Sequence, residues 1–164
     1  MELFILRHGK AEARAMGTND ADRALTGQGR EEIKKIGRWT ITMGYTFEVI
    51  ATSPLKRAME TAEIIGLTTG QEHNIQAWDL LSPGGDLDAL SRQIASAGGD
   101  GSVLIVGHEP MLSTVMSRVI SGNAATSVIL AKGAFARIKN VTFQDQLSGD
   151  LHSLITPKQL PAIH

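Results

Sequence analysis

The chain has 164 residues, of which 42% are hydrophobic and 20% charged, a composition that predicts one globular domain over residues 1–164. Sixteen Lys and Arg against 17 Asp and Glu give a net charge of -1, which argues against a nucleic-acid-binding protein. The absence of Cys excludes disulfides and thiolate chemistry. No apolar run approaches the ~20 residues that span a bilayer, and the N-terminus lacks the pattern of a signal peptide. We therefore expect a cytoplasmic protein without a membrane segment.

The first part of the chain alternates between strand and helix patterns. The first predicted strand is Glu2–Arg7, whose continuous apolar run from Leu3 to Leu6 is typical of a strand covered on both faces. A polar loop over Gly17–Arg23 precedes a predicted helix from Thr26 to Met43, which Gly44 is placed to end. Phe47–Thr52 is the second predicted strand.

A second helix is predicted directly after this strand. Ser53 is a suitable N-cap, Pro54 suits the first helical position, and Gly66 is expected to end the helix. Arg57 and Thr61 share one face of it. The apolar face comprises Leu55, Ala58, Met59, Ala62 and Ile65.

The second half of the chain continues the same alternation. It contains a weak strand (Gln71–Ile75), a loop (Trp78–Asp86), a helix from Asp86 to Ala97 and a buried strand (Ser102–Val106). Pro110 opens a further helix, which ends at Gly122. Four β-like segments follow: Ser127–Leu130, Ala134–Lys139, Val141–Gln144 and Leu151–Ile155. The order of the elements indicates a layered α/β fold.

Three of the apolar runs end in polar groups suited to one chemistry. Arg7-His8-Gly9 follows the first run, Ser53 to Arg57 follows the second, and Gly107-His108-Glu109-Pro110 follows the run at Ser102–Val106. In open α/β sheets, ligands bind beyond the carboxyl ends of the strands. If the three runs are parallel neighbours, two imidazoles and two guanidiniums meet there. Such a set suits a phosphoryl group, whose transfer needs positioned cationic donors.

The residue types suggest a role for each group. Arg7 and Arg57 can hold phosphate oxygens with their planar forks. A neutral His8 can attack phosphorus if its other ring nitrogen donates to a carbonyl, and Gly9 leaves room for a ligand or backbone to approach. His108 is a further donor, and the helix that opens at Pro110 adds free N–H groups.

Each of these residues also has an ordinary interpretation. Arg7-His8-Gly9 alone is compatible with a strand end that turns into solvent, His108 with a helix-capping histidine, and Arg57 with a solvated side chain. Their occurrence in order, each after its own strand, favours a shared site. His73, His152 and His164 have no recognisable partners, and we expect them at the surface.

The motifs together resemble the histidine phosphatase superfamily, which has the phosphoglycerate-mutase-like fold. The resemblance is carried by Leu6–Gly9, Ser53–Ala62 and Val106–Pro110, together with Arg23–Gly29 at the start of the first helix. It implies a three-layer α/β/α fold with a mostly parallel central sheet. It also implies that His8 is the phosphorylated nucleophile and that Arg7, Gly9, Arg57 and His108 bind phosphate, with Arg23 and Ser53 as weaker candidates.

Within the superfamily, the SixA-type phosphohistidine phosphatases resemble this chain most. The short length, the Leu-Ser-Pro-Gly-Gly-Asp stretch at 81–86 and the compact C-terminal β segment support this interpretation. Such enzymes remove phosphate from histidine on phosphotransfer proteins of two-component signalling, without metal or cofactor. A short chain also predicts a shallow pocket that a protein-borne phosphohistidine can reach. The oligomeric state stays open, because no exposed apolar stripe is obvious.

The general acid is the point at which the sequence departs from many superfamily members. Asp79 and Glu109 are the candidates, with Asp86 further along the same loop as Asp79, and none aligns securely. Ester cleavage needs its leaving oxygen protonated, whereas an imidazole leaves more easily. The alternatives are therefore a small-molecule phosphomonoesterase, which acts on a sugar or nucleotide phosphate, and an inactive phosphate-binding module.

Overall fold

The computed structural model describes residues 1–125 and 127–162, which have an α/β fold. These residues contain six strands: β1 (Glu2–Arg7), β2 (Val49–Thr52), β3 (Ile75–Ala77), β4 (Ser102–Gly107), β5 (Phe135–Phe143) and β6 (Leu147–Ile155). They also contain four α-helices: α1 (Gly27–Thr42), α2 (Lys56–Thr69), α3 (Leu87–Gly98) and α4 (Met111–Ser121).

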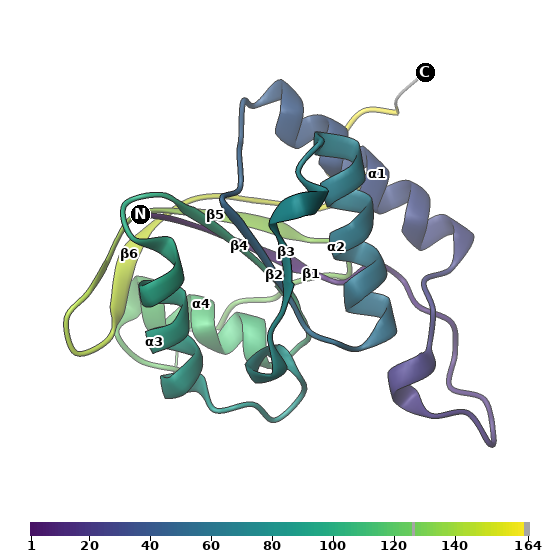
Figure 1. Ribbon diagram of the computed structural model, residues 1–164, viewed down its shortest axis with the longest axis horizontal. Helices are drawn as coiled ribbons and strands as arrows, with labels where there is room; N and C mark the ends of the chain where they lie inside the picture. The colour runs from purple at the N-terminus through teal and green to yellow at the C-terminus, as the bar shows by residue number, and fades with distance from the viewer. Residues whose placement is uncertain (126, 163–164) are drawn as a thin grey trace.

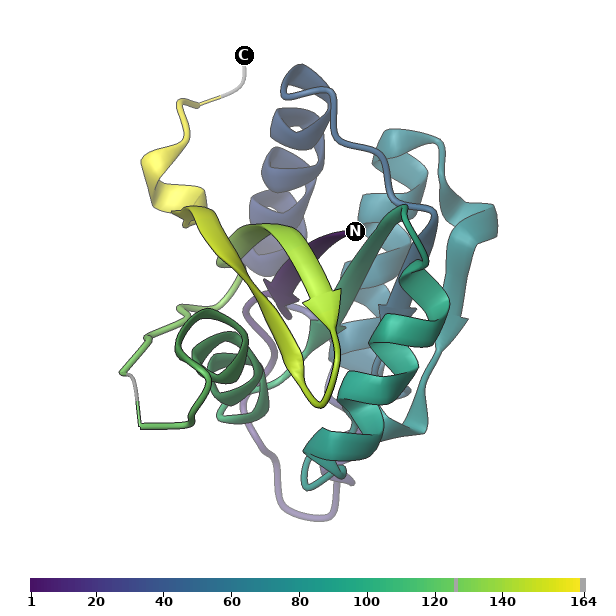
Figure 2. The ribbon, with the colours of Figure 1, turned by 90° about the vertical axis from the view of Figure 1, so that its left-hand side faces the viewer.

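The strands form one mostly parallel sheet in the order β3-β2-β4-β1-β5-β6. β1 pairs in parallel with β4, which pairs in parallel with β2, and β2 pairs in parallel with β3. β5 is antiparallel to β1 and to β6, and the β5–β6 hairpin forms the sheet edge that is prominent in Figure 2. The expected α/β fold with a mostly parallel sheet is confirmed.

The sheet separates two hydrophobic cores, as Figure 1 shows by the helices on its two faces. Leu3 and Ile5 of β1 pack towards α3 and α4, whereas Phe4 and Leu6 pack towards α1 and α2. Successive side chains of a strand point to opposite faces, so a strand covered on both faces must be apolar throughout. This burial explains the continuous apolar runs in the sequence.

Several predicted helix ends are confirmed. Thr26 caps α1 by accepting the N–H of Gly29, and Asp86 caps α3 by accepting the N–H of Ala89. Gly44 follows α1 with φ 70°, and Gly122 ends α4 with φ 78°. Both glycines adopt the left-handed conformation, which costs side-chain-bearing residues energy.

The limits predicted for α2 were wrong at both ends. The helix begins at Lys56, beyond Pro54, and the hydroxyl of Ser53 accepts the N–H of Leu55. At the other end, Gly66 lies inside the helix, where a Cβ would be 2.9 Å from Cα of Glu72. Gly66 therefore permits close packing, and Gly70 (φ 71°) ends the helix.

The β segments also differ from the sequence prediction. Gln71–Ile75 is not a strand, because Glu72–Asn74 forms a 3₁₀ turn and β3 starts at Ile75. Ser127–Leu130 is irregular. The two segments predicted over 134–144 form the single strand β5, which is irregular between Lys139 and Thr142, and the last segment extends from Leu147 to Ile155.

Within the described ranges, no helix combines the length and the apolar character needed to cross a membrane. His73 and His152 are exposed, whereas His164 lies outside the described residues.

Candidate active site

The candidate site lies where β1, β4 and β2 end side by side. His8 directly follows β1, Ser53 follows β2, and His108 follows β4. The backbone fixes their relative positions, because the N–H of His8 donates to the carbonyl of Gly107 (3.0 Å) and that of Ser53 to the carbonyl of Val106 (3.0 Å). The imidazole centroids of His8 and His108 are 5.1 Å apart. The structure therefore brings the two predicted histidines together.

A pocket of about 430 Å³ opens at this edge of the sheet. It contains the four groups expected from the sequence, and its wall is more cationic than the sequence analysis foresaw. The lining residues are Arg7, His8, Ala11, Arg14, Asp20, Arg23, Arg57, Pro83, His108, Glu109 and Lys132.

The ring of His8 is held in one tautomer. Its Nδ1 lies 2.7 Å from the carbonyl oxygen of Gly9, and since a carbonyl only accepts, Nδ1 must carry the proton. Burial lowers the pKa of His8 to about 4, against the smaller opposing effect of this hydrogen bond, and Arg57 and Arg7 lower it further. At neutral pH the ring is therefore uncharged, with an unprotonated Nε2, as a nucleophile requires.

His108 is buried and held by Ser53. Its Nε2 lies 2.8 Å from Oγ of Ser53, and that oxygen also accepts the N–H of Leu55. Ser53 can then direct its proton to Nε2, which favours the tautomer with a proton on Nδ1. Burial, followed by the fields of His8 and Arg57, lowers the pKa of His108 to about 3. A neutral His108 can thus offer one N–H donor.

The two predicted arginines are anchored but retain unused donors. Nη1 of Arg7 donates to the carbonyl of Leu130 (2.8 Å). Arg57, only 4% exposed, donates from Nη1 to the carbonyl of Asp20 (2.9 Å) and from Nη2 to its carboxylate (3.2 Å). Over the described residues, the buried side-chain atoms without a partner are Nε of Arg7, Nε of Arg57, Nδ1 of His108 and Oγ of Ser153. Three of these four atoms belong to residues that line the pocket.

A loop closed by the bridge between Ala11 and Leu25 supplies one side of the pocket. Its Asp20 carboxylate is 2.8 Å from Nε of Arg23 and 3.3 Å from Nη2 of Arg14, in addition to its contact with Arg57. Although burial opposes the change, these cations lower the pKa of Asp20. The loop thus places Arg14 and Arg23 at the pocket rim.

Gly9 has a structural position beside the pocket. A Cβ there would be 2.9 Å from Cγ1 of Ile33 and 3.2 Å from the carbonyl oxygen of Gly29, so the glycine permits α1 to approach. Its N–H donates to Oγ1 of Thr61, which donates in turn to the carbonyl of Arg57. These bonds connect the end of β1 to α2.

The structure separates the candidate acids. Glu109 lines the pocket, and its Oε1 accepts the N–H of Ser113 at the start of α4 (2.9 Å). Asp79 is exposed in a 3₁₀ turn and does not line the pocket. Asp86 caps α3 and is not part of the pocket wall either.

Several pocket residues were not foreseen from the sequence. Arg14, Asp20, Pro83 and Lys132 lie in loops, where no periodic pattern fixes the path of the chain. The sequence feature that could best have indicated them is Asn19, which caps the 3₁₀ turn Asp20–Asp22. It predicts a turn, but not that the turn lies over Arg57.

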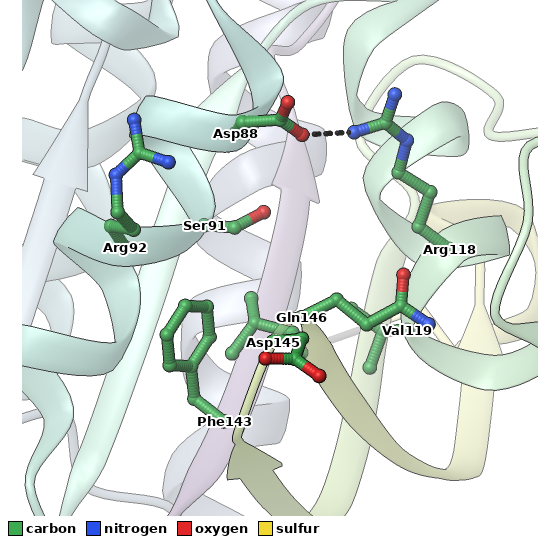
Figure 3. Close-up of a pocket in the computed structure, with 9 residues that line it drawn as sticks. Asp88, Ser91, Arg92, Arg118, Val119, Phe143, Asp145 and Gln146 are labelled. Atoms are coloured by element: carbon green, nitrogen blue, oxygen red, sulfur yellow. Dashed lines mark hydrogen bonds and ion pairs between the residues drawn. The ribbon is translucent and has the colours of Figure 1, made fainter.

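A separate cavity of about 220 Å³ lies between α3, α4 and the β5–β6 hairpin. In Figure 3 its rim carries the ion pair of Asp88 with Arg118 (2.8 Å), with Arg92 opposite and Phe143 below. Neither His8 nor His108 lines it. Considering residues 1–125 and 127–162 only, no three His, Asp or Glu side chains gather in a way that could hold a metal ion.

Comparisons with known proteins agree with this geometry. The family model described as "Histidine phosphatase superfamily (branch 1)" matches residues 3–82. An uncharacterised protein of Picosynechococcus sp. is 32% identical over 98% of this chain and 99% of its own length. The Phosphohistidine phosphatase SixA homolog of Haemophilus influenzae is 28% identical over 73% of this chain and 77% of its own. The solved structure of the protein histidine phosphatase SixA complexed with tungstate superposes with a TM-score of 0.85 and 25% identity, covering 97% and 99% of the two chains.

Proposed function

Since this chain belongs to branch 1 of the histidine phosphatase superfamily and is SixA-like, we propose that it hydrolyses phosphohistidine on a protein through a phosphoryl intermediate on His8. The observation that carries the proposal is the set of buried donors without partners around one neutral histidine. Nε of Arg7, Nε of Arg57 and Nδ1 of His108 each lack an acceptor among the described residues. An unpaired buried donor costs about 1–3 kcal/mol, which a bound phosphoryl group would recover.

The proposed reaction has two displacements. Nε2 of His8 attacks phosphorus, the new P–N bond forms as the substrate P–N bond breaks, and the leaving imidazole nitrogen takes a proton from solvent, to which the hydrolysis step returns one. Water then attacks phosphorus of phospho-His8, which releases inorganic phosphate and restores Nε2 of His8. Arg7, Arg57 and His108 stabilise the charge on the equatorial oxygens in both steps.

The metal-free mechanism follows from the nucleophile. His8 is already neutral at neutral pH, with Nε2 unprotonated, because burial lowers its pKa to about 4, so no metal is needed to activate it. Arg7 and Arg57 supply the positive charge that a cation would otherwise bring to the phosphoryl group.

The decisive experiment follows the intermediate. Wild type is mixed with ³²P-phosphoramidate and quenched in base within the first turnovers, because phosphohistidine is acid-labile and base-stable. We expect label on His8 and release of inorganic phosphate. His8→Ala should lose the label and at least about 10³ of the turnover, as expected when a covalent nucleophile is removed. Label on another residue, or unchanged turnover by the variant, contradicts the mechanism.

Glu109 supports a second candidate function, that of a phosphomonoesterase, because it places a carboxyl group in the pocket wall. A phosphomonoesterase would use such a group to protonate the leaving oxygen. The ratio of kcat/KM for phosphohistidine and for a sugar or nucleotide phosphate separates the two functions. A larger value for the ester, lost in Glu109→Gln, would support the esterase.

Vanadate binding without turnover of either substrate would support an inactive phosphate-binding module.

A further inference from the structure

A second, apolar groove adjoins the pocket of about 430 Å³ around His8 and His108, which we call the phosphate pocket. The groove has a volume of about 210 Å³ and lies between the turn at 83–85 and the first turn of α4. Pro83, His108 and Glu109 line both the groove and the phosphate pocket. A molecule that presents its phosphoryl group to His8 therefore has this groove next to the group it is attached to.

The groove is apolar and held open by the backbone. Leu87, Pro110 and Met111 contribute apolar walls. A Cβ on Gly85 would collide with the carbonyl of Leu80 and lie 3.1 Å from Cε of Met111. The turn can therefore lie close to the core only with glycine at this position. A preformed apolar hollow of this kind favours a single apolar side chain over a polar one.

The rest of the phosphate pocket differs in charge. Arg14, with 72% of its side chain exposed, lines this pocket but not the groove, as do Arg23 and the exposed Lys132. The surface around His8 thus joins a cationic pocket wall to an apolar groove. This asymmetry fits a phosphorylated protein surface, which offers different side chains in different directions, better than it fits a small phosphate.

We propose that the groove accepts an apolar side chain of the phosphorylated protein, next to its phosphohistidine. This inference rests on the proposed function and adds to it the determinant of substrate choice. Leu87 and Thr114 contact the substrate in this proposal but lie outside the phosphate pocket.

The test measures kcat/KM for a series of short peptides that contain one phosphohistidine. Leucine replaces serine at one flanking position at a time, and phosphoramidate serves as the small substrate. We expect at least one position at which leucine raises kcat/KM by about tenfold or more, as partial burial of a leucine implies. The readout is the leucine-to-serine ratio within each enzyme, which cancels changes in overall activity.

Groove variants then locate the effect. Thr114→Asp puts a charge into the groove, yet in the first turn of α4 an acid suits the helix dipole, so the fold should persist. It should reduce the ratio to about one, and Thr114→Val should keep it. Leu87→Ser should lower the ratio, whereas the matched control Leu67→Ser, at a site 69% exposed on α2, should not.

The outcomes distinguish the two proposals. A raised ratio that Thr114→Asp abolishes and Leu67→Ser retains supports the groove. Equal turnover of all peptides by wild type, or a ratio that survives in both Thr114→Asp and Leu87→Ser, overturns the groove and leaves the phosphatase intact. No turnover of phosphoramidate or of any peptide overturns both.

Discussion

At the residue scale, burial and hydrogen bonding act together on His8. The ring is 6% exposed, and its Nδ1 donates to the carbonyl of Gly9. Burial keeps the ring uncharged, and the hydrogen bond determines which nitrogen is unprotonated. A histidine in solution would be partly protonated near pH 6.5 and would exchange tautomers. The site thus presents an unprotonated Nε2 on His8, as the proposed nucleophilic role requires, before any substrate arrives.

The lowered pKa values predict acid sensitivity of the fold. His8 and His108 have folded-state pKa values of about 4 and about 3, against about 6.5 when unfolded. Between these pH limits the unfolded chain binds more protons than the folded chain. The free energy of unfolding should therefore fall as the pH drops from about 6.5 towards 4. Urea unfolding at several pH values should show a smaller fall in His8→Asn than in wild type. An identical pH dependence would contradict the assigned burial effect.

Activity should depend on the shape of the side chain at position 57 as well as on its charge. Arg57→Lys keeps the cation but loses the planar fork and both bonds to Asp20. We expect kcat/KM for phosphoramidate to fall by about 10- to 100-fold, from the loss of hydrogen bonds to a charged group. Arg38→Lys, at an exposed position of α1, should leave it unchanged. Equal activity of both variants would exclude bidentate contact by Arg57.

The sequence predicted the central groups of the site and, as a weaker candidate, Arg23, but not the other residues of its rim. Arg7, His8, Arg57 and His108 could be placed because each ends a strand, directly follows one, or lies on a helix with a clear apolar face. The position of Asp20 depends on how a long loop folds back onto Arg57, which no periodicity encodes. The position of Lys132 could not be predicted either, because it follows Ser127–Leu130, which was predicted as a strand but is irregular.

At the element scale, glycine has distinct roles that the sequence pattern alone does not separate. Gly66 and Gly70 both stand near the end of α2 in the sequence. Gly66 is helical and makes room for Glu72, whereas Gly70 adopts φ 71° and ends the helix. Ser127–Leu130 shows the same limit for strands, because β-branched residues predict a strand only where a partner strand exists. Instead of pairing with a strand, the carbonyl of Leu130 accepts a hydrogen bond from Nη1 of Arg7.

A pair of glycine variants tests this distinction. No atom lies within 4 Å of a Cβ built at Gly70 or at Gly27, so steric clash is absent in both. Gly70→Ala should still cost about 1–2 kcal/mol, because of its left-handed backbone. Gly27→Ala, in the first turn of α1, should stabilise the protein by about 0.5–1 kcal/mol. Urea denaturation measures both, and equal effects would refute the conformational explanation.

At the scale of the whole molecule, charge is distributed unevenly. The chain carries a net charge of -1, yet the pocket around His8 and His108 is lined by Arg7, Arg14, Arg23, Arg57 and Lys132 against Asp20 and Glu109. Like charges collected in a pocket destabilise the empty protein, and a bound anion relieves this repulsion. Stability and ligand binding are therefore coupled through one end of the sheet.

An oxyanion should therefore raise the melting temperature. At a concentration about 100 times its Kd, tungstate or vanadate should add about 2.7 kcal/mol, which corresponds to roughly 5–11 °C for a chain of this size. Sodium chloride at the same ionic strength serves as the control. Thermal unfolding of Arg57→Ala should show little of this shift. A shift of the same size in the variant would mean that the anion binds elsewhere.

The bridge between Ala11 and Leu25 has a consequence for engineering and for evolution. It joins the two ends of a loop that supplies Arg14, Asp20 and Arg23 to the pocket, whereas His8 and His108 lie outside this loop, each directly after a strand. The loop between Ala11 and Leu25 can therefore be exchanged between homologues at these two residues without moving His8 or His108. New recognition preferences could then arise while the chemistry stays the same.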